Sequence, residues 1–65
     1  MEANYEVQLR DEYHEIQIIS LEDVVSINVD YENKFVTFFD SLEEGSMPLL
    51  MVNQGDVLLI KRVIE

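Results

Sequence analysis

The chain lacks cysteine, and it has only one histidine, one proline and two glycines in its 65 residues. Without cysteine, neither a disulfide nor a thiolate metal site can stabilise the fold. A single histidine excludes a metal site built from several imidazoles. A domain of this length has a core that barely offsets chain entropy. Folding must therefore depend on an unusually apolar core or on self-association.

Basic side chains are also scarce, since four of them face 14 acidic residues and leave a net charge of −10. The four are Arg10, Lys34, Lys61 and Arg62. So acidic a surface repels phosphate backbones and anionic membranes, which argues against direct binding to nucleic acid or membrane, and it attracts basic proteins. The alternative is that the acids only keep an apolar β protein soluble and protect its edges.

Long hydrophobic runs are missing as well. The longest, Met47–Val52, is far shorter than a membrane span, and Met1–Asn4 has neither the basic region nor the apolar stretch of a secretory signal. Wherever apolar residues recur at the three- and four-residue spacing of a helix, they also fit the alternating pattern of a strand. We expect one small all-β domain over residues 1–65, in a soluble cytoplasmic protein.

Alternating residues predict a first hairpin over about residues 4–19. Tyr5, Val7 and Leu9 share one face. Asp11-Glu12 is the expected turn, after which Ile16 and Ile18 continue the inward face with His14 in phase.

A second hairpin is predicted from Val24–Tyr31, the polar turn at 32–34, and Phe35–Phe39. Either plausible turn length places Val29 opposite Val36, because both lengths keep the same parity. Phe35 and Phe39 then lie on the opposite, nominally wet face, where they need a cover from this chain or another one.

A third hairpin is predicted from Leu49–Val52, the turn 53–56, and Val57–Ile64. With Gln54-Gly55 at the turn, both faces of this hairpin are apolar. Such strands lie either inside a barrel or sandwich, or in an oligomer interface. One face holds the candidate self-association residues Leu50, Val52, Val57 and Leu59.

Two similar connectors, Ser20–Asp23 and Ser41–Glu44, have the form of a capping box. They allow single helical turns at 20–23 and 41–45 at most, and their similarity is also explained by coincidence. The expected fold is a small antiparallel barrel or curled sheet of five or six strands built from hairpins, of SH3-like or Sm-like size.

Residues that carry catalysis are few. His14 has no marked nucleophile beside it, the two glycines are explained by turns, and the acids lack the order of a calcium loop. We therefore expect no enzyme activity, no catalytic residue, no metal and no cofactor.

Three functional hypotheses remain. The first is a non-catalytic module, an inhibitor or accessory factor, that occupies the nucleic-acid-binding surface of a basic partner protein. Its predicted partner-binding residues are Glu6, Glu15, Asp30, Glu32, Phe35 and Phe39. The second is a homo-oligomeric structural module whose main partner is itself. The third binds or sequesters a small ligand, such as a nucleotide, at a barrel mouth or subunit interface.

Overall fold

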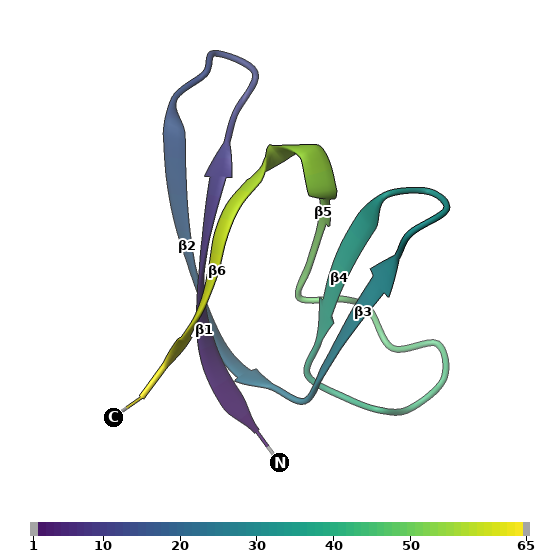
Figure 1. The fold of residues 1–65 in the computed structure, drawn as a ribbon. Coiled ribbons are helices and arrows are strands. Elements are labelled where there is room, and N and C mark those ends of the chain that lie inside the picture. The colour runs from purple at the N-terminus through teal and green to yellow at the C-terminus, as the bar shows by residue number, and fades with distance from the viewer. Residues whose placement is uncertain (1, 65) are drawn as a thin grey trace.

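The computed structural model describes residues 2–64, and their regular structure consists of six strands and one short 3-10 turn (Figure 1). The elements in chain order are β1 (Ala3–Arg10), β2 (Ile16–Val24), β3 (Ser26–Asp30), β4 (Phe35–Phe39), β5 (Leu50–Asn53), the 3-10 turn η1 (Gln54–Asp56) and β6 (Val57–Val63). The expected all-β class is confirmed. Across residues 2–64, no helix has the length and apolar character needed to cross a membrane.

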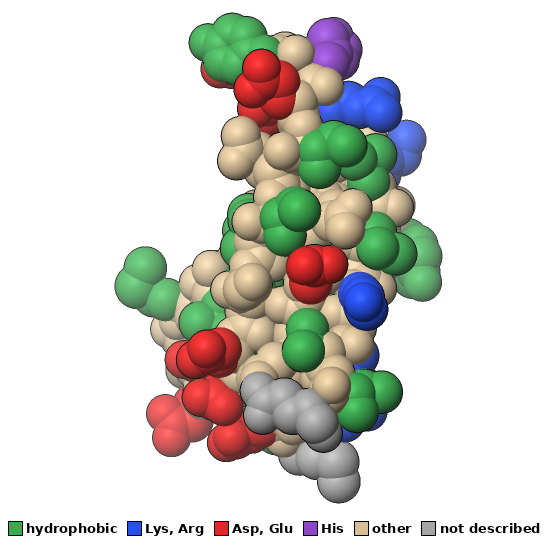
Figure 2. Space-filling model, turned by 90° about the vertical axis from the view of Figure 1, so that its left-hand side faces the viewer, with side chains coloured by type: hydrophobic (Ala, Val, Ile, Leu, Met, Phe, Trp, Pro, Cys, Tyr) green, Lys and Arg blue, Asp and Glu red, His purple; other side chains and the backbone are tan. Residues whose placement is uncertain are grey.

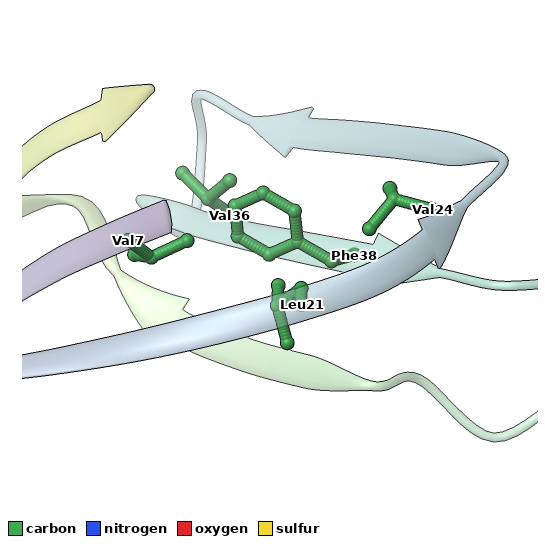
Figure 3. Close-up of a cluster of buried hydrophobic side chains, with 5 residues drawn as sticks. All are labelled: Val7, Leu21, Val24, Val36 and Phe38. Atoms are coloured by element: carbon green, nitrogen blue, oxygen red, sulfur yellow. The ribbon is translucent and has the colours of Figure 1, made fainter. Parts of the chain in front are cut away.

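The strands form two antiparallel sheets of three strands each. Sheet A has the order β2-β1-β6, and sheet B has the order β3-β4-β5. The core lies between their inner faces (Figure 3), and its buried side chains are Val7, Leu21 and Val24 from sheet A and Val36 and Phe38 from sheet B. Alternation along each strand therefore sends the intervening side chains to two outer faces that point away from each other.

The β1–β2 hairpin is confirmed, but its register differs from the predicted one. Leu9 lies opposite Gln17, so Ile16 and Ile18 point outward and each is 60% exposed. The turn spans residues 11–15, with His14 in the left-handed region at φ 63°. Because a shift of one residue exchanges the two faces of a strand, this longer turn makes the inward assignment of the isoleucines wrong.

A β-bulge turns the chain from one sheet into the other. Asp23 has a φ of 56°, and its N–H donates to the Asn4 side-chain oxygen at 3.1 Å. Val24 then enters the core, and the Val25 N–H donates to the Phe39 carbonyl at 2.8 Å. Residues 20–23 are thus the end of a strand, and the helical turn allowed there is absent.

The connector at 41–45 is not helical either. Gly45 has a φ of 79°, and the Ser46 N–H and hydroxyl both donate to the Glu43 carbonyl, at 3.3 and 2.7 Å. These contacts form a tight turn in which glycine supplies the left-handed residue. The single helical turn that the capping-box form allows in this connector is therefore absent.

The β3–β4 hairpin has the predicted register. Val29 lies opposite Val36 and Ile27 opposite Phe38. Phe35 and Phe39 lie opposite Asp30 and Ser26, on the outer face. The parity argument is confirmed.

The predicted third hairpin is wrong. β5 pairs with β4, whereas β6 pairs with β1 in the other sheet. The 3-10 turn η1 makes the connection, with the Asn53 side chain accepting the Gly55 N–H at 2.8 Å. This turn redirects the chain instead of folding β6 back onto β5. Because β5 and β6 do not pair, the strands of residues 2–64 form no closed barrel.

The opposite placement of Phe38 and Phe35 on one strand generates a first prediction. Phe38 is fully buried and Phe35 is 38% exposed. Phe38→Ala should lower the free energy of unfolding by about 3–5 kcal/mol, which is enough to unfold most molecules of so small a domain. Phe35→Ala should lower it by about 1 kcal/mol or less. Urea unfolding of the two variants measures the difference, and equal losses would contradict the observed register.

Candidate functional site

The outer face of sheet B carries a group of apolar side chains, called here the aromatic face. Phe35 and Phe39 come from β4, and Met51 of β5 lies opposite Thr37, which separates them. Met51 is 56% exposed, Phe35 is 38% exposed and Phe39 is half-buried. The aromatic face thus offers two phenyl rings and a flexible thioether to solvent, a combination suited to packing against another molecule.

Acidic residues lie at one end of the aromatic face. Asp30 is opposite Phe35, and Glu32 is in the turn that follows β3. The Asp30 carboxylate accepts the N–H groups of Glu32 and Asn33, both at 3.1 Å, and the Asn33 side-chain amide at 3.0 Å. These hydrogen bonds, the Asn33 amide first, lower the pKa of Asp30. Asp30 therefore shapes the turn, and Glu32 extends the negative charge into solvent.

The other predicted acids lie elsewhere. Glu6 is on the outer face of sheet A, opposite Lys61, and Glu15 is in the β1–β2 turn. The structure brings together Asp30, Glu32, Phe35 and Phe39 but places Glu6 and Glu15 with the other sheet. Met51 belongs to the face and is missing from the predicted set, because its place depends on the β4–β5 pairing.

The predicted self-association residues do not share one face. Leu50 and Val52 lie opposite Phe38 and Val36 and pack against the core. Val57 pairs with Leu9, on the inner face of sheet A. A bulge in β6 then places Leu59 beside Gln8 on the outer face, where it is 45% exposed. The extra residue at the bulge breaks the alternation that put these residues together.

The outer face of sheet A is apolar as well, which the sequence analysis did not indicate. Ile16, Ile18 and Leu59 are exposed there, and Arg10 and Lys61 lie among them. Figure 2 looks onto this side and shows hydrophobic side chains spread over the face, with basic ones along one margin and acidic ones mostly towards the ends. This face is much less acidic than the molecule as a whole.

The described residues offer little for a metal site or for binding an anionic ligand. His14 is exposed in the β1–β2 turn, and within residues 2–64 no group of three or more histidine or acidic side chains could hold a metal ion. An open cavity of about 340 Å³ lies between the sheets near η1 and includes Arg10, while Arg62 lines two others. The basic side chains are thus distributed over different cavities, which gives an anionic ligand little to bind.

Comparisons with models of protein families, with curated proteins and with solved structures find no match to this chain. The candidate site therefore rests on the placement of the side chains themselves. Of the two outer sheet faces, that of sheet B is the one where exposed rings and carboxylates occur together.

The capped turns generate a prediction about pH. Asp11 accepts the Gln17 amide and the N–H groups of Glu15 and Tyr13, and these bonds lower its pKa, as those at Asp30 do. The unfolded chain, with aspartate pKa values near 3.9, then binds more protons in this range than the folded protein. The free energy of unfolding should therefore fall as the pH drops below about 4 and through the lowered values.

Asp30→Asn should reduce the fall in the free energy of unfolding at low pH. Asparagine does not titrate, and it keeps an oxygen that can accept the backbone N–H groups. Glu44→Gln removes one charge from the 41–49 loop and serves as the control. Urea unfolding between about pH 2.5 and 6 gives the profiles. An Asp30→Asn profile as steep as that of the unaltered protein would show that the turn carboxylate does not contribute.

Proposed function

We propose that this protein is a non-catalytic protein-binding module that acts through the aromatic face of sheet B. The observation that carries the proposal is the outward placement of Phe35 and Phe39 on a strand whose inward residues, Val36 and Phe38, already fill the core. Rings held on the solvent side of a sheet are covered at low cost when a partner docks, because the rigid strand fixes their positions beforehand.

The negative charge of this chain indicates a positively charged partner. The chain carries −10, and the aromatic face has Asp30 and Glu32 at one end and Asp40 directly after Phe39 at the other. An apolar centre with a carboxylate rim suits a basic protein surface, which the long-range field attracts before contact. The partner we propose is a basic protein.

The most concrete form of the proposal is a cytoplasmic inhibitor or accessory factor that covers a nucleic-acid-binding surface. Such surfaces are rich in lysine and arginine because they neutralise phosphates. A rigid sheet with carboxylates at both ends of an apolar strip can compete for the same side chains. Three acids, Asp30, Glu32 and Asp40, lie at the ends of the aromatic face against one exposed base, Lys34, directly before Phe35. This excess of acid supports this form over direct binding to nucleic acid.

A matched pair of charge reversals tests the proposal. Glu32→Lys and Glu15→Lys change the net charge equally, but Glu32 borders the aromatic face and Glu15 lies in the β1–β2 turn. A basic partner captured from cell extract should lose about tenfold or more of its affinity for Glu32→Lys and much less for Glu15→Lys. Quantitative pull-down with the purified partner measures both.

The salt dependence of binding and a substitution of Phe35 complete this test. Binding should weaken steeply between about 50 and 300 mM salt, because rim charges are screened. Phe35→Ser should weaken it at every salt concentration, since the ring acts through buried area. An affinity that does not change with salt concentration, or that falls equally in Glu32→Lys and Glu15→Lys, would refute a role for the aromatic face.

A further inference from the structure

β6 is an edge strand with one side unpaired. It pairs with β1, and no other strand of the described residues pairs with it. Three consecutive apolar residues, Leu58, Leu59 and Ile60, are 43%, 45% and 36% exposed. An apolar edge of this kind is a ready template for another strand.

The sequence of this edge is complementary to itself in the antiparallel direction. It runs Asp-Val-Leu-Leu-Ile-Lys-Arg over residues 56–62, with the acid at one end and two bases at the other. A two-fold axis at Leu59 sets Leu59 against its own copy and Leu58 against the partner subunit's Ile60. Asp56 then faces the partner subunit's Arg62, and Val57 faces the partner subunit's Lys61. The apolar centre thus meets its own copy, and each end of the pair joins one acid to one base.

Other registers are less favourable. Moving the axis to Lys61 or Arg62 sets two like charges directly opposite each other, which destabilises a strand pair. An axis at Ile60 sets the leucines against the bases. An axis at Leu58 sets Asp56 against the partner subunit's Ile60 and places no acid opposite either base. The register centred on Leu59 therefore joins Asp56 to a base and avoids pairs of like charge.

Net charge also selects this edge. Two copies of a −10 chain repel each other unless they meet where acids are few. β6 contains no acid and two bases, and Arg10 lies on the neighbouring β1. Asp56, just before β6, supplies the negative charge that faces the partner subunit's Arg62.

We propose that two copies of this chain form an isologous dimer by antiparallel pairing of their β6 edges about Leu59. The pairing extends sheet A into a continuous six-stranded sheet, and it covers Leu58 and Ile60. The aromatic face lies on sheet B and stays free, so this proposal stands or falls independently of the partner-binding function.

Charge reversal across the interface tests the register. Asp56→Arg sets like positive charges opposite each other at both ends of the pair, and Arg62→Asp sets like negative ones there. Each variant alone should dissociate at least tenfold more readily than the unaltered protein. An equimolar mixture should recover a dimer, because both ends of the mixed pair then join opposite charges.

Sedimentation velocity over a range of concentrations gives the result, with circular dichroism to verify folding. The unaltered protein should approach twice 7.6 kDa. A monomer at every concentration, an assembly larger than a dimer, or a mixture no tighter than the single variants would overturn the proposal. Asp56→Arg alone makes the net charge less negative, so tighter association of this variant would show that overall repulsion governs the assembly instead.

A cross-link provides a second measurement. Because the chain has no cysteine, Leu59→Cys introduces a single thiol at the proposed axis. Directly opposite residues of an antiparallel pair have Cα separations that a disulfide can span. Mild oxidation should link Leu59→Cys into dimers much faster than Leu42→Cys, whose side chain is 78% exposed in a loop. Equal rates would count against β6 pairing.

Discussion

Phe38 and Val7 are the fully buried large side chains, and they come from opposite sheets. The Tyr5 ring lies 6.5 Å from that of Phe38 and packs against the same cluster. A three-stranded sheet needs an apolar face covered to be stable, so each sheet depends on the other through these contacts. Once Phe38 points inward, alternation forces Phe35 and Phe39 outward. The exposed rings are thus a consequence of the core.

The small core also explains how much apolar surface remains outside. Among residues 2–64, five apolar side chains are buried, and the exposed large ones far outnumber them. Exposed apolar area favours association, and a net charge that is almost all of one sign opposes it. The acids are absent from β6, the strand that most needs protection. The acids and the strand proposed to pair with a second copy therefore lie on different parts of the same small surface.

The accuracy of prediction from the sequence differs from hairpin to hairpin. The pairing of Val29 with Val36 is predicted correctly because the two turn lengths that the sequence favours share the same parity. Ile16 was misplaced because His14 adopts a left-handed conformation that the residue type does not announce. The polar residues at Gln54–Asp56 predict a hairpin turn, but a 3-10 turn uses the same residue types and only long-range pairing distinguishes the two. The aromatic face was predictable to the extent that it depends on the β3–β4 hairpin.

The geometry of the proposed dimer bears on the proposed function. Residues directly opposite in an antiparallel pair point to the same side, so the two-fold axis at Leu59 runs perpendicular to the extended sheet A. Both copies of sheet B then lie on one side of that sheet, and the two aromatic faces point the same way. Two weak acidic surfaces held together in this manner bind an extended basic partner far more tightly than one, because the second contact is intramolecular. Self-pairing would then strengthen partner binding without any new contact to the partner.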